Sequence, residues 1–332
     1  MPVTDIGMDL GSANIRVWAK GKGIIINEPS VIAYDKDNDQ ILAYGEEANQ
    51  IVARSQGNIV AVRPMKDGVI SDYRVTERML RYFLQRAMGR RSFRKPYLSI
   101  CIPSGVTEVQ KRAVEEAAYQ SGAREVTMVN EIVAAAIGAG IDITKPVGNL
   151  VVDIGAGTCD MAVISVGAPV VFSSGKVAGN YFNEMISRYI RKNHGLFVDE
   201  DTSEEIKLRI GSAYRRSKPV VMQVSGRNVM TGLKKTISVN SEEIRQALKE
   251  CTTQIAEDVH GLLEKTPPEL AADVATRGIV MTGGGSQLDG LSDLIESRTS
   301  VNVMIAENPS CCVAAGTGQY TEMLDQIGRM EY

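Results

Sequence analysis

Two aspartates, Asp9 and Asp153, each lie near the end of a short apolar segment and each precede a glycine-rich turn. The turns are Gly11-Ser12-Ala13-Asn14 and Gly155-Ala156-Gly157-Thr158. Glycine turns let backbone N–H groups approach phosphate oxygens, because no Cβ stands between them. Phosphate-bound Mg²⁺ is commonly held by one or two carboxylates and keeps several waters. The pattern therefore predicts two turns that clamp a triphosphate from both sides, with Asp9 and Asp153 converging on its Mg²⁺.

Either turn alone is more typical of an ordinary tight hairpin than of a ligand site. The two turns, however, share the order aspartate, apolar residue, glycine, and each carries a hydroxyl group, on Ser12 in the first and on Thr158 in the second. This repetition favours a phosphate site over two unrelated hairpins.

A third glycine cluster, Gly283-Gly284-Gly285, follows the apolar segment 278–281. Three glycines that open into a helix, predicted from Leu288 onward, let the backbone approach a flat or charged ligand closely. Glu204 and Lys207 are three residues apart, so a helix presents both side chains on one face. A plain loop and a solvated surface ion pair are the simpler interpretations, and only the combination with the first two turns favours a ligand site.

The two aspartates must be positioned by β-hairpins. Apolar strands are predicted at 6–10 and 15–19 around the first turn, and at 150–154 and 161–166 around the second. The two hairpins lie nearly half the chain apart, which predicts an internal duplication with two similar lobes that face each other.

Helical and strand patterns alternate along the rest of the chain, which indicates α/β lobes in which helices cover mixed sheets. Two stretches, 27–58 and 184–250, are more polar or more charged and are predicted to be insertions into the two lobes. The other predicted elements are helices at 76–88, 108–120 and from 132 to 137, and strands at 97–102 and 126–129.

The composition limits the classes of function. The 332 residues are 44% hydrophobic, enough for at least two lobes. The 37 basic and 40 acidic residues give a net charge of -3, which predicts no general attraction to nucleic acid. Five cysteines without metal-ligand spacing indicate a reduced cytoplasmic protein. An apolar strand begins almost at once, without room for a signal peptide, and no apolar run approaches the ~20 residues of a membrane span.

At this point a family resemblance is evident. The segments 9–14, 153–158 and 282–285 look like the phosphate-one, phosphate-two and adenosine motifs of the actin, Hsp70 and sugar-kinase superfamily. Other stretches narrow the resemblance to the MreB family of bacterial actins, and it runs from about residue 5 to residue 325. These stretches are Asn27-Glu28-Pro29-Ser30 and residues 63–70 (Arg-Pro-Met-Lys-Asp-Gly-Val-Ile), 103–107 (Pro-Ser-Gly-Val-Thr), 134–138 (Ala-Ala-Ala-Ile-Gly) and 264–270 (Glu-Lys-Thr-Pro-Pro-Glu-Leu).

The resemblance implies an actin-like ATPase fold. Two duplicated ribonuclease-H-like lobes would surround a nucleotide cleft, each with a smaller inserted subdomain. The implied subdomains are IA at 1–30, 65–144 and 310–332, IB at 31–64, IIA at 145–180 and 252–309, and IIB at 181–251.

The resemblance also implies roles for individual residues. Glu131 would orient the attacking water, assisted by Thr158, while Asp9 and Asp153 organise Mg²⁺; a metal of this kind offsets charge on the transferred phosphoryl group. Without the resemblance, Glu131 is equally well explained as a carboxylate favoured at a helix start. The residues implied to contact ATP or ADP are Gly11, Ser12, Ala13, Asn14, Gly155, Ala156, Gly157, Thr158, Glu204, Lys207, Gly283, Gly284 and Gly285.

Several positions depart from the family pattern. The family usually has threonine at Ser12, glycine at Ala156, a threonine-glutamate pair at Cys159-Asp160, proline at Ile132 and aspartate at Asn180. The added methyl group of Ala156 fits a phosphate loop only if its φ is negative. We therefore expect nucleotide binding to persist in a slow ATPase whose rate these departures alter; the sequence does not decide between ATP and GTP.

One loop combines an aromatic ring with basic side chains, and relatives place a membrane-inserting hydrophobic loop here. A buried ring contributes ~1.5 to 3 kcal/mol and each cation near anionic lipid ~1 kcal/mol. A solvated basic loop is the simpler interpretation. The residues are Arg90, Arg91, Phe93, Arg94 and Lys95.

The implied function is an ATP-dependent, filament-forming scaffold on the inner face of the cell membrane, which guides cell-wall synthesis and rod shape. Its implied partners are further copies of itself in antiparallel double protofilaments, inner-membrane lipid and membrane proteins of wall elongation. The alternatives are an Hsp70-like or regulatory nucleotide-binding protein, although the chain carries no substrate-binding domain, and a small-molecule kinase, for which no pocket motif is found.

Overall fold

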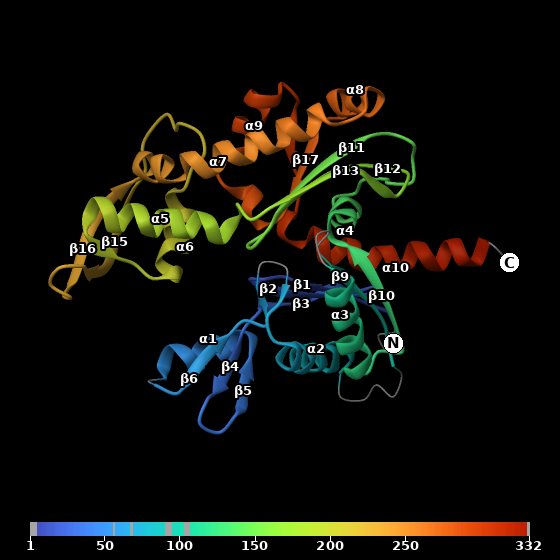
Figure 1. Cartoon of the computed structure of the whole chain (residues 1–332), viewed down its shortest axis with the longest axis horizontal. Helices are drawn as coiled ribbons and strands as arrows, with labels where there is room; N and C mark the ends of the chain where they lie inside the picture. Colours follow the sequence, from blue (N-terminus) through green and yellow to red (C-terminus); the bar gives the residue numbers. More distant parts are fainter. Residues whose placement is uncertain (1–4, 56, 67–68, 90–94, 103–106, 331–332) are drawn as a thin grey trace. The chain divides into compact units, whose positions relative to one another are not determined.

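The structure, a computed structural model, describes residues 5–55, 57–66, 69–89, 95–102 and 107–330. The chain divides into two compact units (Figure 1). Unit 1 comprises Met1–Lys145, Val166–Ala168 and Ser310–Tyr332, and unit 2 comprises Pro146–Ser165 and Pro169–Pro309.

The core of unit 1 is a five-stranded sheet in the order β3-β2-β1-β9-β10. Strands β1, β2 and β3 are antiparallel neighbours, whereas β9 and β10 run parallel to β1. Every residue of β1 is buried, as expected for a central strand with both faces covered. The bounds are β1 Asp5–Leu10, β2 Asn14–Ala19, β3 Gly23–Pro29, β9 Tyr97–Ile102 and β10 Glu125–Asn130.

Helices cover the two faces of this sheet. Because side chains alternate along a strand, Ile6 and Met8 lie on one face, where they join the core formed with α2 and α3. Gly7 lies on the other face, where an added Cβ would come within 2.5 Å of the Gly318 nitrogen in α10. The helices of unit 1 around this sheet are α2 Tyr73–Met88, α3 Glu108–Gln120, α4 Glu131–Gly138 and α10 Cys312–Met330.

Unit 2 repeats this topology. Its sheet has the order β13-β12-β11-β17-β18, with β11 antiparallel to β12 and parallel to β17, and with β17 parallel to β18. The duplication predicted from the two aspartate hairpins is therefore present in the strand order of the two sheets. The bounds are β11 Asn149–Ile154, β12 Cys159–Ser165, β13 Ala168–Gly175, β17 Ile279–Thr282, β18 Val303–Ile305, α5 Gly179–His194, α7 Ser241–Glu264, α8 Pro268–Arg277 and α9 Leu291–Thr299.

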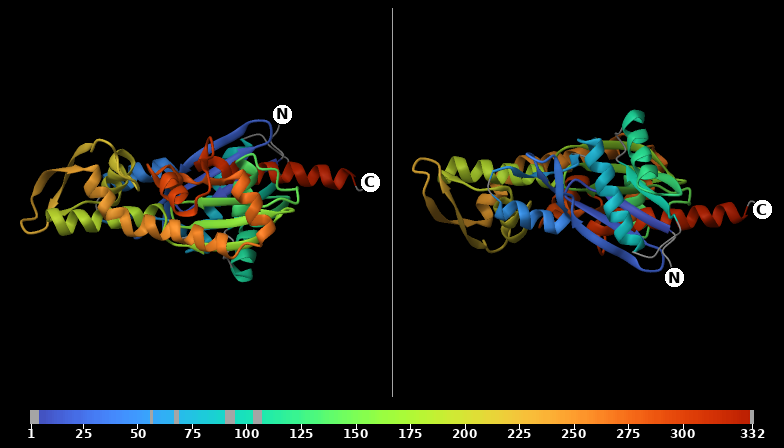
Figure 2. Two further views of the ribbon diagram at one scale, coloured as in Figure 1. Left: turned by 90° about the horizontal axis from the view of Figure 1, so that it is seen from above. Right: turned by 90° about the horizontal axis from the view of Figure 1, so that it is seen from below.

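Each unit also contains a smaller three-stranded sheet. In unit 1, β4, β5 and β6 pack with α1 around a small core of Val31, Ala33, Ala43 and Ala48. In unit 2, β14, β15 and β16 form a sheet beside α6. Figure 2 shows the β15–β16 hairpin at the left of both views, away from the five-stranded sheet of its unit. The bounds are β4 Ile32–Asp35, β5 Gln40–Tyr44, β6 Ile59–Val62, α1 Gly45–Arg54, β14 Leu196–Phe197, α6 Glu200–Ile210, β15 Val221–Asn228 and β16 Lys234–Asn240, with a two-stranded pair β7 Met65–Lys66 and β8 Val69–Ile70.

The strands and helices predicted before residue 160 are all found, with ends that differ from the predicted ones by at most three residues. The helix predicted from Leu288 onward is α9, which begins three residues later. The glycines enter a 3₁₀ turn at Gly284–Gln287, and Leu288 is extended. Gly290 has φ 70°, a left-handed conformation that separates this turn from α9, which begins at Leu291. Of the helices that the structure describes, none has the length and apolar content that crossing a membrane requires.

Candidate functional site

The first aspartate turn lies at the end of β1 in unit 1. Asp9 is buried and stands opposite Arg16 in the hairpin, with 3.4 Å between Arg16 Nη1 and Asp9 Oδ2. Burial raises the pKa of the Asp9 carboxyl, and the Arg16 guanidinium opposes that rise. A Cβ added to Gly11 would come within 2.6 Å of the Asn14 carbonyl oxygen, so this tight turn requires glycine.

Cys101 interacts with Asp9 and with a second predicted site residue, Glu131. The Cys101 thiol donates to Asp9 Oδ1 over 3.4 Å. Burial, followed by the charges of Asp9 and Glu131, raises the pKa of this thiol well above its usual value. Glu131 opens α4 directly after β10, with Asn130 as the N-cap that accepts from the Ile132 amide at 3.1 Å. Because β9 and β10 run parallel to β1, both carboxylates lie at the same edge of the unit 1 sheet.

The second turn is tied to the start of α5 in unit 2. The Gly155 amide donates to the Thr158 carbonyl at 2.9 Å, which closes the turn. The Gly179 amide donates to the Gly155 carbonyl at 3.1 Å, and the Asn180 amide to the Ala156 carbonyl at 2.8 Å. Ala156 does not have a positive φ, so its methyl group is accommodated without backbone strain. The loop is therefore closed and anchored despite the missing glycine.

Asp153 is a buried carboxylate next to the last residue of β11, and Thr282 donates its hydroxyl to Asp153 Oδ1 at 2.7 Å. The neighbouring strand places Asp160 opposite Asp153 in the antiparallel register. Asp160 is buried and accepts a hydrogen bond from Ser174, but its Oδ2 has no hydrogen-bond partner among the described residues. Burial raises the pKa of Asp160, and it also raises the pKa of the Cys159 thiol. Asp160, which stands where the family usually has glutamate, is thus a poorly compensated buried acid beside Asp153.

Glu204 and Lys207 form an ion pair on α6, with 2.7 Å between Lys207 Nζ and Glu204 Oε2. Lys207 also donates to the Gly179 carbonyl at 3.2 Å, and Asn183 donates to Glu204 Oε2 at 2.7 Å. Only 11% of the Lys207 side chain is exposed, whereas 43% of the Glu204 side chain is, so the lysine end of this pair lies inside the protein and the carboxylate end reaches solvent. Through Gly179, the structure brings the α6 pair and the second turn together.

The three glycines of the adenosine-like motif differ in their surroundings. Gly283 has φ 80° and ψ 160°, and an added Cβ would overlap the Ile154 carbonyl. A Cβ on Gly285 would come within 2.5 Å of Ile154 Cγ2. An added Cβ on Gly284 meets nothing within 4 Å. Close packing on β11 therefore explains Gly283 and Gly285, whereas Gly284 alone borders open space.

Four predicted membrane residues, Arg90, Arg91, Phe93 and Arg94, lie outside the described residues, and Lys95 is exposed. Sequence reasoning did not single out Arg16, Cys101 or Asn183 as site residues, and it included Thr282 only as part of the 282–285 motif. The hairpin register pairs Asp9 with Arg16 and was a usable signal, because both strands were predicted. Cys101 contacts Asp9 and Asn183 contacts Glu204, residues that lie on other elements of the chain. No local sequence pattern predicts these two contacts.

Solved structures with a similar fold are actin-like. The crystal structure of MreB 5 of Spiroplasma citri bound to AMPPNP matches with a TM-score of 0.92 and 36% sequence identity, covering 98% of each chain. The MamK double helical filament matches with a TM-score of 0.83 at 22% identity, over 96% of this chain and 98% of that one, and supports the fold alone. The fold and the duplicated aspartate hairpins thus define an actin-like protein.

Sequence comparisons give the family. The family model described as MreB/Mbl protein matches residues 3–329. The cell shape-determining protein Mbl of Bacillus subtilis strain 168 is 46% identical over 323 residues, 97% of each chain. The cell shape-determining protein MreB of Escherichia coli K12 is 44% identical over 329 residues, 98% of this chain and 95% of the relative. The chain belongs to the MreB/Mbl family of cell-shape proteins, which confirms the predicted resemblance and disfavours the chaperone-like alternative.

Proposed function

We propose that this chain binds ATP with Mg²⁺, hydrolyses it slowly to ADP, and assembles into filaments that act as a cytoskeletal scaffold for rod shape. The observation that carries this proposal is the joined cluster in unit 2, where the Gly155–Thr158 turn, the start of α5 and the half-buried Lys207 meet at Gly179. Solved structures of MreB 5 of Spiroplasma citri hold AMPPNP and ADP, and their likeness to this chain supports a nucleotide at the equivalent place.

The residues present fit a magnesium-bound nucleotide. Asp9 and Asp153 supply hard carboxylate oxygens at the ends of buried strands, which suit Mg²⁺. Burial raises the pKa of Asp9 although Arg16 is nearby, so a further positive charge there would be favourable. When bound, the metal would offset negative charge on the phosphates. Asp9 and Asp153 would hold it, and the amides of the two glycine turns would bind phosphate oxygens.

Two side chains of the protein, those of Glu131 and Thr158, would orient the water that attacks the terminal phosphate. Glu131 lies at the same sheet edge as Asp9, where its carboxylate can accept a hydrogen bond from a water that attacks the terminal phosphate. The Thr158 hydroxyl, half-buried at the end of the second turn, would hold that water from unit 2. Glu204 and Lys207 would contact the adenosine end, and Gly284 would let the nucleotide pass close to the backbone.

The departures from the family pattern act on hydrolysis more than on binding. Ala156 keeps the loop conformation without strain, and Ser12 retains a hydroxyl group. Asn180, in contrast, is neutral where the family usually has aspartate, and Asp160 carries its carboxyl on a side chain one methylene shorter than the usual glutamate. We therefore propose that turnover is slow and that filament disassembly follows hydrolysis.

The proposal extends to organisation in the cell. The subdomain boundaries predicted above are retained, and the two small sheets of β4–β6 and β14–β16 support the idea of one insertion in each half. Filaments would form antiparallel double protofilaments, attach to the inner face of the membrane through the loop at residues 90–95, and meet membrane proteins of wall elongation. Head-to-tail contacts that do not close into a ring generate such open filaments.

Sedimentation tests the function directly. Purified full-length protein should pellet with Mg-ATP and stay in the supernatant when EDTA removes the metal. An Hsp70-like regulatory protein, the alternative, would bind ATP without forming polymer. Pelleting that is independent of both ATP and Mg²⁺, or nucleotide binding with no polymer at any concentration, would contradict the proposed function.

A further inference from the structure

Asn183 is a buried amide on α5 whose two polar atoms are in different situations. The residue is 5% exposed. Its Nδ2 donates to Glu204 Oε2 at 2.7 Å, whereas its Oδ1 has no hydrogen-bond partner among the described residues. A carboxylate oxygen only accepts hydrogen bonds, so the atom that faces Glu204 must be the amide nitrogen. A buried acceptor without a partner lowers the stability of a fold, and stability alone therefore does not explain this amide.

Two contacts, one helical turn apart, join α5 to α6. Lys207 Nζ donates to the Gly179 carbonyl at 3.2 Å, and Asn183, four residues further along α5, donates to Glu204. Lys207 also donates to Glu204 Oε2 at 2.7 Å, and this is the oxygen that accepts from Asn183. Two donors thus hold Oε2. They leave Oε1 as the outer oxygen of a side chain that reaches solvent.

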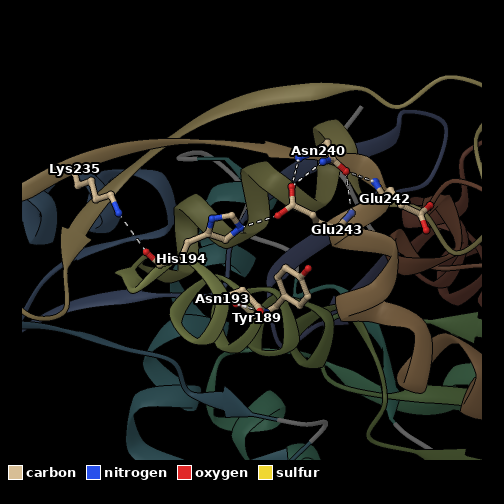
Figure 3. Close-up of polar contacts among 7 residues, drawn as sticks. All are labelled: Tyr189, Asn193, His194, Lys235, Asn240, Glu242 and Glu243. Carbon is tan, nitrogen blue, oxygen red and sulfur yellow. Dashed lines mark hydrogen bonds and ion pairs between the residues drawn. The ribbon is translucent and has the colours of Figure 1, made fainter.

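The position of α5 is fixed at both ends. At its start, the Gly179 amide donates to the second glycine turn. At its end, His194 Nε2 lies 2.7 Å from Glu243 Oε1, and the His194 carbonyl accepts from Lys235 at 3.4 Å (Figure 3). Glu243 belongs to the capping box that starts α7, so this end of α5 is tied to α7 and β16. These contacts hold Asn183 in one register along α6.

The order of these contacts indicates which part of a nucleotide meets Glu204. The contacts run from the second glycine turn through Gly179 and Lys207 to Glu204. If the turn binds phosphate, the next group along a nucleoside triphosphate is the sugar. A carboxylate repels phosphate and accepts hydrogen bonds from hydroxyl groups. The outer oxygen of Glu204 therefore suits the sugar hydroxyls.

We propose that Asn183 is a positioning residue of the nucleotide site, which holds Glu204 so that Oε1 accepts a hydrogen bond from a sugar hydroxyl of ATP. The inference rests on the proposed function and adds to it a residue that does not itself touch the nucleotide. An amide suits this role because it donates to Glu204 without adding charge. With Lys207 as its one anchor, Glu204 would sample more rotamers, and ordering it on binding would weaken the affinity.

Asn183→Leu separates positioning from folding, because leucine has a similar branched shape but neither donates nor accepts hydrogen bonds. Equilibrium dialysis of the full-length protein should show about tenfold weaker binding of Mg-ATP, the usual effect of losing one hydrogen bond. The urea midpoint should stay the same or rise, since the unpartnered acceptor is removed as well. The smaller Asn183→Ala should show the same loss of affinity. Asn193→Leu, at an exposed position of the same helix, is the matched control and should change neither quantity.

A second nucleotide shows whether the effect passes through Glu204. Dideoxy-ATP, which lacks both sugar hydroxyls, should bind the parent protein and Asn183→Leu equally well. Asn183→Leu/Glu204→Ala should bind Mg-ATP no more weakly than Glu204→Ala alone, because the two residues act as one unit.

Three results would overturn the inference. Unchanged ATP binding by Asn183→Leu, or an equal loss of affinity for ATP and dideoxy-ATP, would exclude the positioning role and leave the proposed function standing. A parent protein that binds neither nucleotide would overturn both the inference and the proposed function.

Discussion

At the scale of single residues, the part of the site in unit 1 depends on two carboxylates, Asp9 and Glu131, that lie at the same edge of the sheet. Asp9 lies near the end of the buried β1 strand and is balanced by Arg16, while Glu131 starts α4 at the same edge. Cys101 lies between the two carboxylates with its thiol pKa raised, so it remains a neutral donor to Asp9. Buried carboxylates that lack full compensation are common at functional sites.

The role proposed for Glu131 is tested by Glu131→Gln, which keeps the shape of the side chain and removes its charge. Phosphate release with Mg-ATP should fall by about 10²-fold or more, the usual effect of losing a positioned acid-base group. ATP affinity should stay the same. Glu125→Gln, at the exposed start of β10, is the matched control. Equal turnover of Glu131→Gln and the parent protein would exclude this role.

Asp160 gives a prediction about stability and pH. Burial raises its pKa in the folded protein above the usual 3.8, so the folded state binds this proton more tightly than the unfolded state does. Its contribution to stability is therefore most favourable below pH 3.8 and is lost as the pH rises through the raised value. Asp160→Asn removes this penalty and should raise the urea midpoint at pH 7, with little difference at pH 3.5. A lower midpoint at pH 7 would show that the charge at Asp160 stabilises the fold.

At the scale of elements, the glycine motif at the end of β17 separates packing from ligand approach. Gly283 is held against the Ile154 carbonyl in a region of φ and ψ that other residues avoid, while Gly284 borders open space. Two adjacent glycines of one motif therefore have different roles, packing for Gly283 and ligand approach for Gly284, and the sequence does not distinguish them.

A pair of substitutions tests these two roles. Stability is measured without nucleotide, and binding is measured with it. Gly283→Ala should lower the free energy of unfolding by about 1 to 3 kcal/mol, because of its backbone conformation. Gly284→Ala should leave stability within about 0.5 kcal/mol, as is usual for open surface positions. Thermal unfolding measures both, and titration with a fluorescent ATP analogue should show weaker binding by Gly284→Ala. Equal destabilisation by the two variants would contradict the assignment.

The elements around the two hairpins were predictable because their strands are short apolar runs bounded by glycine and because the order of residues repeats. The start of α9 was not predictable. Leu288 and Asp289 fit a helical pattern, but Gly290 takes a left-handed conformation, and the Asp289 carbonyl accepts from the Ala213 amide at 2.7 Å. A contact with a segment some 75 residues away along the chain overrides the local preference here.

The candidate site was predictable in part for the same reason. The residue types at Asp9, Asp153 and the three glycine turns are visible in the sequence because each follows an apolar strand. The partners that balance them come from other elements: Thr282 for Asp153, Cys101 for Asp9 and Asn183 for Glu204. Such partners depend on which strands and helices become neighbours, and a single sequence does not specify that directly.

At the scale of the whole molecule, the chain consists of two units with the same order of strands, each carrying a small inserted sheet. This is the actin-like architecture of the MreB/Mbl family, in which we propose that ATP controls assembly.

The most direct measurement is sedimentation of the purified full-length chain as ATP is titrated in the presence of Mg²⁺, with bound nucleotide quantified in the same samples. The proposed function predicts that polymer appears as the nucleotide site fills. Lys207→Met should move both curves to higher ATP concentration together, whereas the exposed Lys218→Met should move neither. Polymer that forms equally without ATP, or a filled site that never yields polymer, would contradict the account.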